Sequence, residues 1–116
     1  MILNKNLDVK STINIEVEDH EGVTLEVRNT FKGSEITKVL TANDTVGRHE
    51  AQDVCTLLFL KGWKGVIDND GNDIPVIVKN NILSSQLFEI IPTSFKEAVY
   101  THFVDTYLLS KEELKN

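Results

Sequence analysis

The chain has 116 residues, with eighteen acidic and twelve basic side chains and a formal net charge of -6. A chain of this length can bury a hydrophobic core without metal or disulfide support, so we expect one domain over residues 1–116. The acidic balance repels phosphate backbones and argues against nucleic acid as a direct partner. The lone Cys55 cannot form an internal disulfide, which is typical of a reducing compartment.

The sequence shows no targeting signal and no membrane span. Met1 to Leu3 is followed at once by Asn4-Lys5-Asn6, so the apolar stretch of a signal peptide does not form. No apolar run approaches the length that a membrane span needs. We therefore expect an intracellular protein without a membrane partner, with a loose N-terminal arm at residues 1–11 and a polar tail at residues 110–116.

Alternating residues predict a β-hairpin near the N-terminus. Ile13, Ile15 and Val17 alternate with polar residues, and the same pattern returns after the turn Asp19–Gly22. In the second run Val23, Leu25 and Val27 point one way, against Thr24, Glu26 and Arg28. A period of two with one apolar face is typical of a half-buried antiparallel hairpin.

Two helices are predicted in the middle of the chain. Ser34 can cap a short helix, and the polar stretch Thr41–Thr45 predicts a break after it. A longer helix from about Val46 to Lys61 carries an apolar stripe wide enough to be buried on most sides.

The most distinctive stretch runs from Trp63 to Val76. The pair Lys61-Gly62 precedes it, and a cation followed by glycine is typical of a helix C-terminus. Within it, apolar residues flank a cluster of Asp, Asn and Gly residues, and Asp70-Gly71 favours a tight turn. We predict a corner in which the buried helix passes through a Trp-Lys-Gly elbow into a small Asp-Gly hairpin.

The C-terminal third is predicted to be helical. Val78–Asn81 is turn-like, and the apolar residues from Ile82 to Ile91 indicate one interrupted helix or two short ones, with Ser84-Ser85 as a cap. Pro92 ends this segment. Ser94 and Glu97 form a capping box that opens the last helix, and a second capping box begins at Ser110. The fold class is therefore α+β: an N-terminal β-hairpin, a central buried helix, a small Asp-Gly hairpin and C-terminal helices.

No residue pattern supports a metal site or catalysis. The acids Asp68, Asp70 and Asp73 miss the ligand positions of a calcium loop in either register, so we interpret them as turn residues. The three histidines fall on three separate elements without a second ligand at a zinc spacing. Cys55 lies inside an apolar helix, where a thiol stays protonated and inert. We predict neither an enzyme nor a cofactor.

Two groups of apolar residues are candidates for binding a partner. Trp63 is either a core anchor whose indole N–H bonds a nearby carbonyl or a hot spot for a partner. The stripe on the last helix is either intramolecular core or a face for a groove or an oligomer, and Tyr100 lies off it. The stripe consists of Phe95, Val99, Phe103 and Tyr107.

The run from Leu57 to Val76 resembles the tail assembly chaperones of long-tailed bacteriophages. The resemblance is strongest in Trp63-Lys64-Gly65-Val66-Ile67-Asp68 through Gly71. Many of those small acidic proteins carry a Trp-x-Gly-Val-x-Asp-x-x-Gly phrase after an apolar helix. An Ile/Leu-Pro dipeptide often follows, as Ile74-Pro75 does here. They end in a helix like Ser94 to Leu109, and the hairpin at Thr12 to Val27 is similar to the β-rich start of some members.

The resemblance implies a role in assembly through protein–protein contacts. Family members are thought to bind the tape measure protein and to keep its long hydrophobic helices soluble until the tail tube polymerises around them. The implied setting is the cytoplasm of the bacterial host, and the major tail protein is a second implied partner. Association of this chain into a homo-oligomer is a further possibility that the sequence leaves open. Because the N-terminal hairpin departs from the mostly helical members, the alternative is a virion structural subunit, such as a tail-tube or head–tail completion protein.

Overall fold

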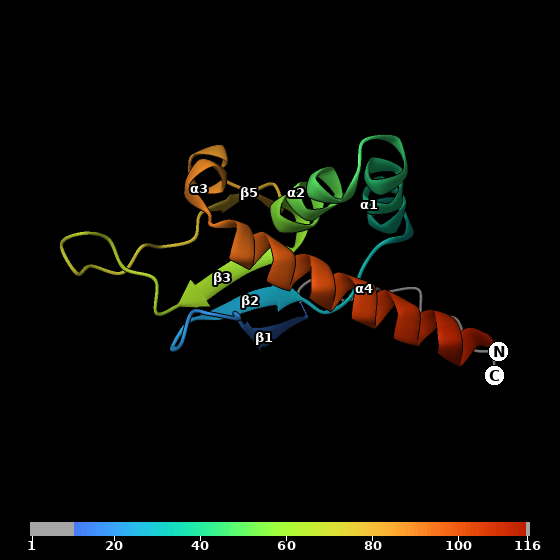
Figure 1. Ribbon diagram of the computed structural model, residues 1–116, viewed down its shortest axis with the longest axis horizontal. Helices are drawn as coiled ribbons and strands as arrows, with labels where there is room; N and C mark the ends of the chain where they lie inside the picture. Colours follow the sequence, from blue (N-terminus) through green and yellow to red (C-terminus); the bar gives the residue numbers. More distant parts are fainter. Residues whose placement is uncertain (1–10, 116) are drawn as a thin grey trace.

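The computed structural model describes the backbone of residues 11–115 and the side chains of residues 11–107 (Figure 1). Almost all of the predicted N-terminal arm lies outside the described residues. The elements in chain order are β1 (Thr12–Glu16), β2 (Thr24–Arg28), α1 (Gly33–Thr45), α2 (Arg48–Phe59), β3 (Leu60–Lys64), β4 (Val78–Lys79), β5 (Ile82–Leu83), α3 (Ser85–Ile90) and α4 (Thr93–Lys115). The α+β class is confirmed.

The predicted N-terminal hairpin is present. Strand β1 pairs antiparallel with β2, with Ile13 opposite Val27 and Ile15 opposite Leu25. Leu25 and Val27 are fully buried, because β2 is the middle strand and its apolar face lies under the helices. Ile13, on the outer strand, is 43% exposed. The alternation therefore assigns the correct face, and position in the sheet sets the depth of burial.

Helix α1 is longer than predicted. It begins at Gly33, with Lys32 as its N-cap, and continues to Thr45 instead of breaking at Thr41. The reason is Ala42, which is buried on the same face as Val39, so the helix keeps a packed stripe through a polar-looking sequence. Two backbone N–H groups, of Val46 and Gly47, then donate to the carbonyl of Ala42 and end the helix.

The predicted helix from Val46 to Lys61 is too long at both ends. Helix α2 spans Arg48–Phe59, and Val46 lies outside it with 74% of its surface exposed. The chain then enters β3 directly, so Lys61-Gly62 is not a helix C-terminus. Strand β3 pairs with the edge of β2 that β1 leaves free, and it places the buried Leu60 opposite Val27. A β-bulge between Glu26 and Val27 accommodates the extra residue.

The prediction of helix at Ile82-Leu83 is wrong. These residues form β5, which pairs with β4 across a two-residue turn. Asn80 and Asn81 both have positive φ, the conformation that a tight hairpin turn requires and that asparagine tolerates. Ser84 then occupies the N-cap position of α3, as expected, although its side chain makes no cap hydrogen bond.

Helix α4 follows Pro92 as predicted but does not start at the capping box. It begins at Thr93, and the N–H groups of Phe95 and Lys96 point to the carbonyl of Pro92. Ser94 therefore lies inside the first turn, not at the N-cap. The helix continues to Lys115, so the predicted second start at Ser110 is not a break.

Helices cover one face of the three-stranded sheet, whose order is β1-β2-β3 (Figure 1). Helix α4 contacts both α2 and β1, and α1 packs on α2. The buried apolar residues form one cluster from all of these elements: Val17, Leu25, Val27, Val39, Ala51, Cys55, Phe59, Leu60, Leu83, Leu87, Ile91, Phe95, Val99 and Phe103. The molecule is elongated, with extents of 53 × 30 × 28 Å.

Candidate functional site

Trp63 anchors the corner where the sheet passes into the projecting loop. It lies on β3 opposite Leu25, on the face of the sheet that the helices cover. Its indole Nε1–H donates to the carbonyl of Ile74 at 2.6 Å, and its ring meets Phe95 edge to face with the centroids 6.0 Å apart. The anchor interpretation of Trp63, with an indole N–H bonded to a nearby carbonyl, is confirmed.

Gly65 turns the chain out of the sheet. Its φ is +82°, and a Cβ atom built on it would lie 2.3 Å from the carbonyl oxygen of Gly22. A side chain at this position would therefore collide with the β1–β2 turn as well as strain the backbone. This close approach explains the glycine of the Trp-Lys-Gly elbow.

The loop after Gly65 folds back on itself and projects from the body of the molecule (Figure 1). A single antiparallel bridge joins Ile67 to Asp73, and the N–H of Asp68 donates to the carbonyl of Asn72 at 2.8 Å. The Oδ1 atom of Asp68 accepts hydrogen bonds from the N–H groups of Asp70 and Asn72. The predicted small hairpin is confirmed, and the Asp68 carboxylate is occupied in holding its turn.

An apolar hollow of about 200 Å³ opens beside Trp63. We call it the corner hollow, and its lining consists of Trp63, Val66, Ile67, Ile74, Ile90, Ile91, Pro92 and Phe95. Every one of these residues is apolar apart from the indole N–H, which is already bonded. Ile67 is 58% exposed and Ile90 is 63% exposed, so both present apolar surface to solvent at this site.

The sequence-predicted stripe on α4 belongs mostly to the core. Phe95, Val99 and Phe103 are buried, and Tyr107 is half-buried against the ring of Phe103 at 5.9 Å. Of the predicted partner-binding residues, only Trp63 and Phe95 line the corner hollow. Val99 and Phe103 face inward, so in this fold a partner cannot reach them. The intramolecular interpretation of the stripe is the one that the packing supports.

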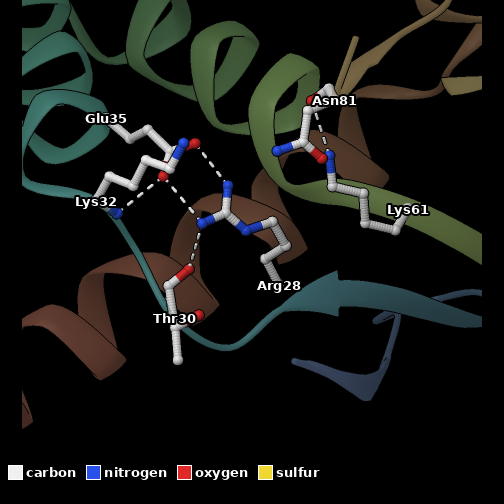
Figure 2. A network of polar contacts seen from close by, with 6 residues as sticks. All are labelled: Arg28, Thr30, Lys32, Glu35, Lys61 and Asn81. Carbon is white, nitrogen blue, oxygen red and sulfur yellow. Dashed lines mark hydrogen bonds and ion pairs between the residues drawn. The ribbon is translucent and has the colours of Figure 1, made fainter. Parts of the chain in front are cut away.

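Arg28 is the largest departure from the predicted pattern. The alternation places it on the polar, outward side of β2, yet it is fully buried. Its guanidinium forms a bidentate ion pair with Glu35, with Nη1–Oε2 at 2.5 Å and Nη2–Oε1 at 2.9 Å (Figure 2). Nη2 also donates a hydrogen bond to the carbonyl of Thr30. The guanidinium also lies 5.5 Å from the ring centroid of Phe59. The pair therefore joins the end of β2 to the first turn of α1.

Glu35 also closes the start of its helix. Its Oε1 accepts the backbone N–H of Lys32 at 2.8 Å. Burial by itself raises the pKa of Glu35, but the hydrogen bonds from Arg28 and Lys32, with the charge of Arg28, lower the pKa overall below its ordinary 4.5. A sequence signal for this arrangement exists: an acid in the first turn of a helix that directly follows a strand ending in arginine.

Lys61 lies beside this pair (Figure 2). Its Nζ donates to the carbonyl of Asn81 at 2.8 Å, which ties β3 to the β4–β5 turn. Burial, together with the nearby positive charge of Arg28, lowers the pKa of Lys61 to about 8.

The cysteine and the candidate metal ligands are the side chains on which thiol chemistry or metal binding would depend. Cys55 is fully buried, and burial raises the pKa of its thiol, so the reactive thiolate does not form near neutral pH. Residues 11–107 contain no cluster of three His, Cys, Asp or Glu side chains that could hold a metal ion. The histidines His20, His49 and His102 lie in a turn, on α2 and on α4.

A cleft of about 540 Å³ lies between β1, the turn after it and α4. Its charged lining is acidic except for Arg48 and the titratable His102, and it consists of Glu16, Glu18, Asp19, Arg48, Glu97, His102 and Asp105. Burial lowers the pKa of His102, although a hydrogen bond to the backbone of Arg28 and the charge of Asp105 oppose this shift. Such a lining repels phosphate and other anions.

Comparison with protein-family models, with curated protein sequences and with solved structures finds no match for this chain. Along the part of the chain that the structure describes, none of the helices has the length and apolar character needed to cross a membrane.

Proposed function

We propose that this protein is an assembly factor of the tail assembly chaperone type, which binds the tape measure protein of a long-tailed bacteriophage in the cytoplasm of its host. The observation that supports this proposal is the corner hollow. It is apolar and open to solvent, and Trp63, Val66 and Ile67 of its lining belong to the phrase that resembles that family.

The hollow suits an apolar side chain that projects from a partner helix. A tape measure protein exposes long apolar stripes before the tube forms, and such stripes aggregate unless another surface covers them. One side chain of the stripe would enter the hollow, and its neighbours one turn away would cover Ile67 and Ile90. The net charge of -6 keeps the rest of the complex in solution.

The area involved predicts a weak contact. Burying the exposed parts of two isoleucines contributes about 2–4 kcal/mol before the cost of association. Stable protein complexes bury far larger surfaces. Binding along a stripe would therefore need several copies of the chaperone, each held weakly and released as the tube grows.

Co-expression with the cognate tape measure protein tests the proposal. We expect the wild-type chain to keep the tape measure protein soluble and to co-purify with it, and Ile67→Asp or Ile90→Asp to abolish both effects. The matched control is Val46→Asp, which charges an even more exposed residue at the end of α1, outside the hollow. A tape measure protein from another phage controls for non-specific holding.

Two results would contradict the proposal. One is a wild-type chain that fails to hold the tape measure protein in solution. The other is equal loss of binding in Val46→Asp and the hollow variants. Recovery of the chain from purified phage particles, together with failure of rescue, would favour a virion subunit instead.

A further inference from the structure

The open edge of the three-stranded sheet is a second surface of interest, independent of the corner hollow. The sheet order leaves β1 and β3 at its two edges. The edge at β3 lies beside the loop that Trp63 binds through Ile74. Among the described residues, β1 has a strand partner only on the side of β2.

The hydrogen-bond register shows which groups the open edge presents. The N–H of Asn29 donates to the carbonyl of Ser11 at 2.9 Å, so Ser11 and Asn29 occupy a hydrogen-bonded position of the ladder. Hydrogen-bonded pairs alternate along an antiparallel ladder, so Ile13 and Ile15 are also bonded to β2. The N–H and C=O groups of Thr12, Asn14 and Glu16 therefore point away from β2, toward the open edge.

This edge has few of the features that usually prevent strand pairing. Natural edge strands are protected by charged side chains, especially lysine, by proline or by a β-bulge, and β1 carries one charge, at Glu16. The sequence of β1, Thr-Ile-Asn-Ile-Glu, has no proline or lysine, and its register with β2 is unbroken from Thr12 to Glu16. The bulge of this sheet lies on the other side, between β2 and β3. Ile13 adds exposed apolar surface beside the edge.

We infer that β1 pairs antiparallel with β1 of a second copy of this chain, around a two-fold axis at Asn14. This register uses all five residues of the strand. Asn14 meets Asn14 of the other copy, and the outward groups of Thr12 bond those of Glu16. Ile13 meets Ile15 at a position without hydrogen bonds, where opposite side chains approach most closely. The result is a continuous six-stranded sheet with its helices on one side.

The charges along β1 favour this register over its neighbour. A two-fold axis at Glu16 would place two glutamates directly opposite each other, which is destabilising. The axis at Asn14 places Glu16 opposite the hydroxyl of Thr12 instead. Both copies are acidic, and the cleft beside β1 is acidic as well, so we expect added salt to increase the dimer fraction.

Cysteine cross-linking tests both the dimer and its register. Asn14→Cys places two thiols on residues whose Cα atoms lie about 5.5 Å apart in the dimer, within the range of a disulfide. Thr12→Cys is the matched control, because its two copies would lie roughly 13 Å apart along the strands. Cys55 is fully buried and does not compete. We expect mild oxidation to give a covalent dimer with Asn14→Cys and not with Thr12→Cys.

Light scattering on the full chain gives a second readout. The wild-type chain should show a dimer whose fraction rises with protein concentration. Ile13→Lys should return it to a monomer, whereas Ile77→Lys, which charges a residue that is 50% exposed and outside β1, should not. A monomer at every concentration, equal cross-linking at both cysteine positions, or equal loss of the dimer in both lysine variants would overturn the inference. If Ile13→Lys does not fold, the cross-linking pattern decides.

Discussion

At the scale of single residues, Trp63 joins the sheet, the last helix and the projecting loop. Its ring contributes packing against Phe95, and its N–H contributes one hydrogen bond to Ile74. These two contributions can be separated by substitution, because phenylalanine retains most of the ring packing and has no N–H.

We expect Trp63→Ala to lower the free energy of unfolding by about 3 kcal/mol, because it removes a large packed side chain. Trp63→Phe should lower it by about 1 kcal/mol, the usual net contribution of one hydrogen bond. Urea denaturation of the three proteins measures both values. If Trp63→Ala unfolds at the wild-type urea concentration, Trp63 is not an anchor of the fold.

At the scale of elements, the Arg28–Glu35 pair connects the hairpin to the helices. Removing one member leaves the other charge buried and unpaired, and Arg28 is fully buried. We expect Glu35→Gln to cost about 3 kcal/mol, within the range for breaking a buried ion pair. Replacing both residues together, as Arg28→Met with Glu35→Leu, should cost less than Glu35→Gln alone.

Thermal unfolding of the wild type, Arg28→Met, Glu35→Leu and the double variant completes a double-mutant cycle, and Glu35→Gln is measured beside it. The matched variant is Glu26→Gln, which removes a carboxylate from an exposed position on the same strand as Arg28. It should change the stability by no more than about 0.5 kcal/mol. A Glu35→Gln protein as stable as Glu26→Gln would show that the buried pair adds no net stability.

Local patterns in the sequence predict the elements better than their connections. The period-two alternation predicts the hairpin, and Asp70-Gly71 predicts the projecting turn, because both signals act between near neighbours. Local signals do not predict the start of β3, because Lys61-Gly62 has the local character of a helix end. Its actual conformation depends on pairing with β2, far away in the sequence.

The same limit applies to the candidate site. Trp63 stands out as a lone tryptophan at a corner, and the sequence supports both an anchor and a partner-binding interpretation of it. The two exposed isoleucines, Ile67 and Ile90, come from separate segments that only the folded chain brings to one hollow. Alternation along β2 likewise assigns Arg28 to a face, but it does not reveal that α1 covers the strand end.

For the molecule as a whole, two titratable groups, the half-buried His102 and the buried Glu35, make the free energy of unfolding depend on pH. The pKa of His102 is lowered from its ordinary 6.5, chiefly by burial. The pKa of Glu35 is lowered from 4.5, because the Arg28 and Lys32 hydrogen bonds outweigh burial. In both cases the unfolded chain takes up its proton at a higher pH than the folded chain. Stability is therefore full above the unfolded pKa and is lost as the pH falls.

The two groups act in different windows, which makes their contributions separable. Loss of stability should begin below pH 6.5 through His102 and increase again below pH 4.5 through Glu35. We expect His102→Gln to flatten the upper part of the curve and Glu35→Gln the lower part. Urea unfolding at a series of pH values, at constant ionic strength and low protein concentration, measures both parts. His49→Gln is the control for the upper window, because His49 is exposed on α2. A wild-type curve that stays flat from pH 6.5 to pH 4.5 would mean that His102 binds its proton equally well in the folded and the unfolded chain.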